Sequence, residues 1–117
     1  RNFPALMRRA DVVVSRAGAG TIWELSACGR PAVLIPLSTG ASRGEQMRNA
    51  ERYRRAGAAL VLTDPGPDRF VRTIERLLQN PGERRAMSDA ARGWGRSDAA
   101  QVIAREIERI ADSMETV

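Results

Sequence analysis

The fold is decided by residues 11–25, whose sequence is DVVVSRAGAGTIWEL. Residues 12–15 form a short run of β-branched, apolar residues that ends in a serine, which is typical of a buried parallel strand. A glycine-rich turn over residues 16–20 follows, and Thr21 then begins a helix that we expect to reach Ala27. A strand, a glycine-rich turn and a helix in this order indicate a crossover unit of a parallel α/β sheet.

The alternation of strands and helices continues beyond this unit. Gly29 and Pro31 end the first helix, and Asp68 is a candidate cap for a later one. The apolar patterns predict strands at residues 32–35 and 59–62, and helices over residues 3–10, 45–55, 70–78, 83–91 and 97–114. A parallel sheet usually has more than three strands, so we expect residues 1–117 to be one partial domain. Its fold class is α/β, a Rossmann-like sheet truncated at its N-terminal side, with a helical C-terminal tail.

Composition and charge exclude several classes of function. The 117 residues carry a net charge of +5, and every basic residue is an arginine. The absence of histidine excludes histidine-based catalysis and histidine metal sites within this chain. Aromatic stacking platforms and metal-finger spacings are missing, so nucleic acid is not an expected partner. Cys28 is expected to be a small buried residue. No metal and no cofactor are predicted.

The glycine-rich turn is the first candidate binding site, through Gly18, Ala19, Gly20 and Thr21. Glycines let a ligand approach the backbone, and a helix N-terminus offers free N–H groups and the positive end of a dipole. The site would therefore suit a diphosphate or sugar oxygens. Glycines that serve packing alone remain the alternative. The spacing fits neither a Walker loop nor a dinucleotide fingerprint, because Trp23 stands where the third glycine would be.

Glu24 is the second candidate, one turn into the same helix. A carboxylate that accepts two hydroxyl hydrogen bonds is the usual way to hold a ribose. The alternative is a capping box between Thr21 and Glu24.

Glu45, Gln46 and Asn49 are the third candidate group, just past the loop after the second strand. Gln46 and Asn49 are three residues apart, so they share one face of the helix. Amides and carboxylates pair with the vicinal hydroxyls of sugars. A solvated helix start is the alternative.

Taken together, four motifs resemble a known family. They are residues 10–25, residues 29–36 (GRPAVLIP), residues 46–50 (QMRNA) and residues 56–59 (AGAA). In order and spacing they resemble the C-terminal domain of the MurG-type glycosyltransferases, family 28, which have the GT-B fold. The resemblance is specific over about residues 3 to 63 and looser through the helical tail.

The resemblance implies that the chain binds a UDP-sugar, commonly UDP-N-acetylglucosamine. Gly18, Ala19, Gly20 and Thr21 would then contact the diphosphate and sugar, and Glu24 would hold the ribose. The sugar hydroxyls would be read by Glu45, Gln46 and Asn49. Arg16 or Arg43 would assist with the diphosphate charge, and no metal would be required.

The resemblance also implies that parts of the enzyme lie outside this chain. The acceptor domain and the catalytic base of the family precede this segment, so no catalytic residue is expected here, and transfer would proceed with inversion. The acceptor would be lipid-linked, as in peptidoglycan or glycolipid synthesis. The location would be cytoplasmic, with peripheral attachment to the anionic inner face of the membrane as a further expectation. A non-catalytic subunit or nucleotide-binding module that needs a partner chain remains the alternative.

Departures from the family pattern leave the sugar open. Ala17 stands where a serine is frequent, and the histidine that some members carry beside the glutamine is absent. The loop over residues 38–44 also differs from the commonest variant. A paralogue is therefore as consistent with the sequence as the peptidoglycan enzyme.

Overall fold

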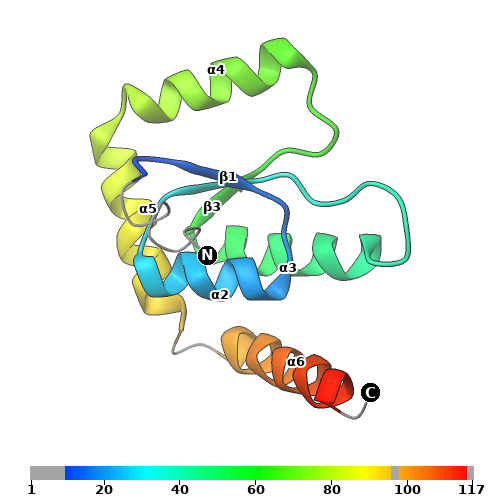
Figure 1. The fold of residues 1–117 in the computed structure, drawn as a ribbon. Helices are drawn as coiled ribbons and strands as arrows, with labels where there is room; N and C mark the ends of the chain where they lie inside the picture. Colours follow the sequence, from blue (N-terminus) through cyan, green and yellow to red (C-terminus); the bar gives the residue numbers. More distant parts are fainter. Residues whose placement is uncertain (1–9, 96–97, 116–117) are drawn as a thin grey trace.

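The computed structural model describes residues 10–95 and 98–115, apart from the side chains of residues 98–100, 102 and 112–115. Figure 1 shows a small sheet with helices on both sides and a last helix below them. The elements are β1 (Val13–Ser15), α2 (Ala19–Cys28), β2 (Ala32–Leu34), α3 (Arg43–Arg55), β3 (Ala59–Val61), α4 (Pro67–Leu78), α5 (Pro81–Trp94) and α6 (Asp98–Glu115). The predicted helix over residues 3–10 falls almost wholly outside the described residues.

The sheet confirms the predicted α/β class. Its three strands are parallel and lie in the order β1-β2-β3. Val13 is level with Ala32, and Ala32 with Ala59, so the carboxyl ends of all three strands lie at one edge. Ligands of open α/β sheets bind at that edge.

One face of the sheet carries the larger core. Ile22 and Leu25 of α2 and Tyr53 of α3 are fully buried against this face. Trp94 closes the cluster, and its ring meets that of Tyr53 edge-on, with centroids 5.2 Å apart. Cys28 packs against the margin of this core but is only half-buried, whereas the sequence predicted a buried residue.

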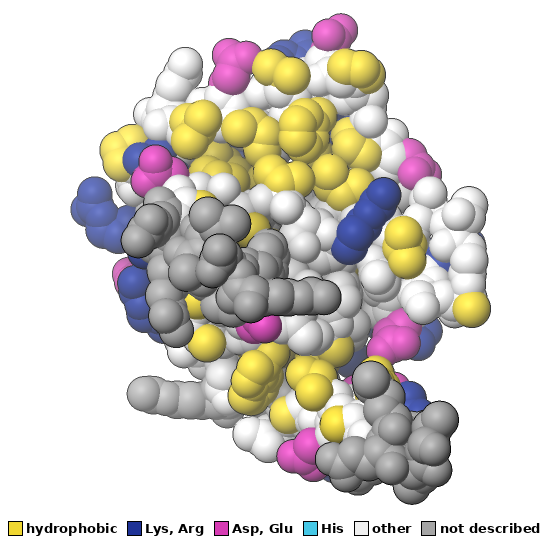
Figure 2. All heavy atoms as spheres, in the orientation of Figure 1, with side chains coloured by type: hydrophobic (Ala, Val, Ile, Leu, Met, Phe, Trp, Pro, Cys, Tyr) yellow, Lys and Arg dark blue, Asp and Glu magenta, His cyan; other side chains and the backbone are white. Residues whose placement is uncertain are grey.

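The other face carries a smaller core beneath α4. Val33, Leu62, Leu77 and Met87 form it. The prediction that residues 12–15 form a continuously buried strand is wrong at Val14, which is 42% exposed on this side. Strand residues alternate between faces, and α4 covers this face incompletely. Figure 2 shows hydrophobic side chains gathered over this region.

Several helix boundaries differ from the predicted ones. α2 begins at Ala19 rather than Thr21, because Gly18 is the extended residue before the helix and Gly20 takes helical dihedrals inside it. Gly29 ends α2 as predicted, with a left-handed φ of 63°.

The caps of the two later helices also differ. Asp68 does not cap α4; Gly66 is its N-cap and Pro67 its first residue, so Asp68 lies in the first turn. α5 begins at Pro81, because the side chain of Asn80 accepts a hydrogen bond from the backbone N–H of Glu83.

α5 ends later than the predicted boundary at residue 91. α5 continues through Gly93 to Trp94, and the burial of Trp94 in the main core holds this last turn in place. The sequence spaces the isoleucines of α6 four and three residues apart, so they form an apolar stripe along one side of the helix. Ile103 is buried, Ile107 half-buried and Ile110 exposed, while the side chain of Val102 lies outside the described residues. Within the described part of the chain, no helix has the length and apolar character to cross a membrane.

Candidate functional site

The N-terminus of α2 is the centre of the candidate site. It has no side-chain cap and no acidic residue in its first turn. The N–H groups of Ala19, Gly20 and Thr21 precede the first bond of the helix, in which Ile22 N donates to the carbonyl of Gly18 at 3.1 Å. Such N–H groups and the dipole behind them favour an anion.

The next three helices begin differently. α3 has Glu45 in its first turn, α4 has Asp68, and α5 has both Glu83 and the Asn80 cap. Each carboxylate lies where it offsets the dipole of its own helix. Among α2 to α5, therefore, α2 alone keeps its positive end without an acidic residue or a side-chain cap.

Two amides of α3 hold the glycine-rich turn in place. Gln46 Oε1 accepts from the backbone N–H of Ala17 at 3.2 Å and from that of Leu37 at 3.0 Å. Asn49, which is only 4% exposed, donates its Nδ2 to the carbonyl of Ala17 at 3.3 Å. The backbone N–H and the carbonyl of Ala17 are therefore both held by α3, through two side chains that lie one helical turn apart.

This clamp on Ala17 determines what each amide can still offer. The oxygen of Gln46 is occupied by two backbone donors, so its Nε2 is the atom available to donate outward. The nitrogen of Asn49 is used on Ala17, so its Oδ1 is the atom available to accept. The predicted pair therefore combines a positioning role with one open donor and one open acceptor.

A cavity of about 360 Å³ opens beside this turn, and we call it the turn pocket. Six of the eight sequence-predicted site residues line it. The complete lining is Gly18, Ala19, Gly20, Ser42, Glu45, Gln46, Asn49, Ile107 and Ile110. Three segments far apart in the sequence meet here: the glycine-rich turn, the start of α3 and the middle of α6.

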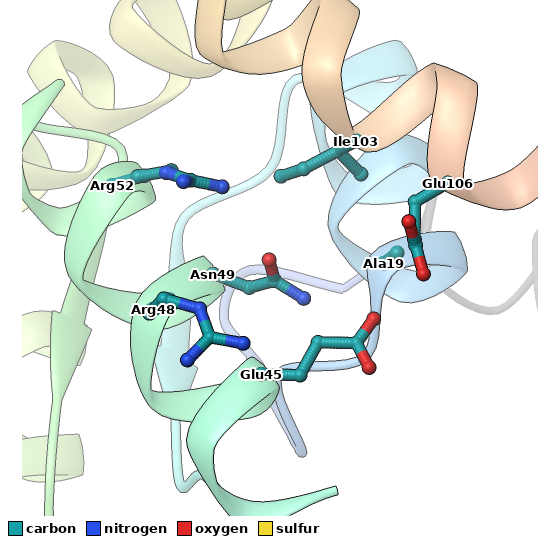
Figure 3. Close-up of a pocket in the computed structure, with 7 residues that line it drawn as sticks. All are labelled: Ala19, Glu45, Arg48, Asn49, Arg52, Ile103 and Glu106. Carbon is teal, nitrogen blue, oxygen red and sulfur yellow. The ribbon is translucent and has the colours of Figure 1, made fainter.

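A second, smaller hollow of about 230 Å³ adjoins the turn pocket between α3 and α6. Figure 3 shows Glu45, Arg48, Asn49 and Arg52 projecting from α3, opposite Ile103 and Glu106 of α6. The hydrogen bond from Arg109 lowers the pKa of the Glu106 carboxyl, which is therefore ionised at neutral pH. The two carboxylates and two arginines make this hollow strongly polar.

Thr21 and Glu24 lie on α2 outside the lining of the turn pocket, and both are half-buried. The capping-box alternative for this pair is wrong. It requires Thr21 at the N-cap, whereas Gly18 is the N-cap and Thr21 is the third residue of the helix. Of the two arginines considered for the diphosphate, Arg16 is exposed and donates to the carbonyl of Ile35 at 3.2 Å, and Arg43 is exposed at the first turn of α3.

The residues that sequence reasoning missed are those of α6. The isoleucine stripe was visible as helical spacing, but the pattern carried no information about which surface it would cover. In the structure α6 packs against α2, and Ile107 and Ile110 reach the glycine-rich turn. No local signal marks a contact between residues so far apart in the chain.

Comparison with known proteins finds a matching family model and several similar proteins. Residues 1–105 match the model of the glycosyltransferase family 28 C-terminal domain. A UDP-N-acetylglucosamine--N-acetylmuramyl-(pentapeptide) pyrophosphoryl-undecaprenol N-acetylglucosamine transferase of Rhodopseudomonas palustris is 41% identical over 112 residues, which are 94% of this chain and 30% of that protein.

Proteins with the same name in two other bacteria are also similar. The one from Lactobacillus acidophilus is 38% identical over 113 residues, 95% of this chain and 30% of its own length. The one from Treponema denticola is 47% identical over 70 residues, 58% of this chain and 18% of its own length. This chain thus spans less than a third of the curated relatives that it matches.

Proposed function

Because the chain belongs to the glycosyltransferase family 28 C-terminal domain family, we propose that it binds the UDP-sugar donor within a longer hexosyltransferase. The proposed donor is UDP-N-acetylglucosamine, which the names of the relatives contain. The proposed acceptor is lipid-linked, and residues 1–117 form the later part of the donor-binding domain. The observation that carries the proposal is the uncapped N-terminus of α2, clamped at Ala17 and open to a pocket lined by Glu45, Gln46 and Asn49.

Each part of the donor has a proposed partner. The N–H groups of Ala19, Gly20 and Thr21 would face the diphosphate and the adjoining sugar, where fixed donors oppose negative charge without reorganisation. Glu45 and Asn49 Oδ1 would accept from sugar hydroxyls, and Gln46 Nε2 would donate to one. Glu24 would accept both hydroxyls of the ribose from its position on α2.

The chemistry assigned to the full-length protein is a direct displacement. The hydroxyl of the acceptor attacks the anomeric carbon while the bond from that carbon to the UDP oxygen breaks, so configuration inverts and UDP leaves. A base outside this chain removes the hydroxyl proton. The donor-binding groups contribute by placing the anomeric carbon and by stabilising the charge that develops on the leaving diphosphate.

Isothermal titration of the full-length protein with UDP and with UDP-N-acetylglucosamine tests these roles. Glu24→Ala is expected to weaken both ligands by about 10- to 100-fold, since a charged hydrogen bond contributes about 1.5–3 kcal/mol. Glu45→Ala is expected to weaken UDP-N-acetylglucosamine alone, because UDP lacks the sugar. Glu75→Ala, an exposed glutamate on α4, is the matched control.

Unchanged affinity of the Glu24 variant for UDP would remove the ribose assignment. Equal losses in the Glu75 control would show that the effect is a general loss of charge. Failure of the unsubstituted protein to bind UDP at all would overturn the donor-binding proposal.

A further inference from the structure

The isoleucines of α6 pass from the core to the rim of the turn pocket. Ile103 is 2% exposed within the main core, Ile107 packs on that core while half-buried, and Ile110 is 44% exposed. Ile107 and Ile110 both line the turn pocket. Core packing accounts for Ile103 and in part for Ile107, but it gives no reason for a large apolar side chain at position 110.

The turn pocket therefore has two chemically different walls. The glycine-rich turn and α3 supply backbone N–H groups, the Glu45 carboxylate and the open atoms of Gln46 and Asn49. Among the side chains of α6 that the structure describes, the wall of the turn pocket is formed by two aliphatic ones, Ile107 and Ile110. Sites that recognise small ligands commonly combine a few placed polar groups with an apolar surface that excludes the wrong substituent.

A simple hexose does not match both walls, because hydroxyl groups surround its ring. An N-acetylhexosamine carries a single apolar projection, the methyl group of the acetamide, beside an amide that can bond to carboxylate and amide groups. Facing the methyl toward Ile107 and Ile110 would leave the hydroxyls toward α3. The alternative orientation would bury hydroxyls against isoleucine without partners, which is unfavourable.

We propose that Ile107 and Ile110 of α6 form the wall that selects an N-acetylated sugar, by covering the acetamide methyl group. This inference rests on the proposed function and assigns the sugar specificity of that same site to the helical tail. One methylene in a closed apolar pocket changes discrimination by about 10- to 200-fold. The turn pocket is open on one side, so we expect the lower end, about a 10-fold preference for the acetylated sugar.

The experiment measures dissociation constants of UDP, UDP-glucose and UDP-N-acetylglucosamine for the full-length protein by isothermal titration. Ile110→Ser and the double variant Ile107→Ser with Ile110→Ser are compared with the unsubstituted protein. Ile110→Val keeps an apolar wall and controls for loss of shape. Leu78→Ser, which removes a similarly exposed apolar side chain from α4, is the matched control.

The expected result is a preference for UDP-N-acetylglucosamine over UDP-glucose that falls to about unity in the double variant and partly in Ile110→Ser. The affinity for UDP should stay unchanged in the serine variants, Ile110→Val should keep part of the preference because it keeps an apolar wall, and Leu78→Ser should keep all of it. Since Ile110 is 44% exposed and lies outside the larger core, Ile110→Ser should remain folded, and thermal melting verifies this.

Two results overturn the inference in different ways. If UDP binds but the serine variants keep the full preference, or the unsubstituted protein has none, then α6 does not select the sugar and the donor-binding proposal still stands. If UDP does not bind the unsubstituted protein, the proposed function fails and this inference fails with it.

Discussion

On one face of the sheet, α2 and α3 bury large side chains and α6 packs on α2, whereas on the other face α4 covers the strands incompletely. Tyr53, Ile22 and Leu25 are fully buried on the first face. On the second, Val71 and Leu78 of α4 are each 49% exposed. α5 joins the two, because Met87 belongs to the smaller core and Trp94 to the larger.

The candidate site lies on the densely packed side. The clamp on Ala17 comes from α3, whose Tyr53 is buried in the larger core, and the apolar wall comes from α6, whose Ile103 is buried there as well. Hydrogen-bond donors that are already fixed in place bind an anion without a cost in reorganisation, so this face is the one suited to binding a charged ligand. The α4 face holds the sheet together but positions no group of the candidate site.

A paired truncation gives the largest expected effect. Leu25→Ala should lower the free energy of unfolding by about 3–5 kcal/mol, and Leu77→Ala by about 2–3 kcal/mol. Both leucines are fully buried, but the surroundings of Leu77 can relax toward solvent while those of Leu25 cannot. Urea unfolding followed by circular dichroism measures both. Equal losses would show that the two cores are packed to the same degree.

Tyr53→Phe is the next test, because it removes a polar group from the dense core. The hydroxyl of Tyr53 and Nε1 of Trp94 are buried without a hydrogen-bond partner among the described residues. Burial also raises the pKa of the Tyr53 hydroxyl, which stays protonated. Removing an unpaired buried hydroxyl should leave stability unchanged or raise it by up to about 1 kcal/mol. A loss of stability of more than about 1 kcal/mol would show that the Tyr53 hydroxyl has a hydrogen-bond partner, such as a buried water.

Leu78→Gln should have the smallest effect, within about 0.5 kcal/mol of the unsubstituted chain. Half of this leucine is already in contact with solvent, so little apolar area is lost. A change in the thermal midpoint comparable with that of Leu77→Ala would contradict the incomplete cover of the α4 face. It would indicate that this face is buried against another surface in the longer protein.

Local patterns in the sequence sufficed for the elements but not for their contacts. The apolar run at β1, the glycines around α2 and the stop at Gly29 each act through neighbouring residues, so the strand-turn-helix unit was predicted correctly. The Asn80 cap of α5 was also present as a local signal, an asparagine before a proline, although the helix was predicted to begin only at residue 83.

The clamp on Ala17 could not be predicted in this way. Ala17 is separated from Gln46 by 29 positions and from Asn49 by 32, and only the crossover through β2 brings them together. The spacing of Gln46 and Asn49 correctly indicated one shared helix face, but not that half of each amide is used internally. The position of α6 is a similar case, since a stripe of isoleucines specifies a face to bury and leaves its partner undefined.

The two bonds accepted by Gln46 have a consequence for how this position can vary. A glutamate there would keep an oxygen for the N–H groups of Ala17 and Leu37, so the turn would retain its shape. The outward atom would change from a donor to an acceptor. One atom of this side chain therefore holds the glycine-rich turn, and exchange between the two residue types changes the chemistry of the other atom without changing the turn.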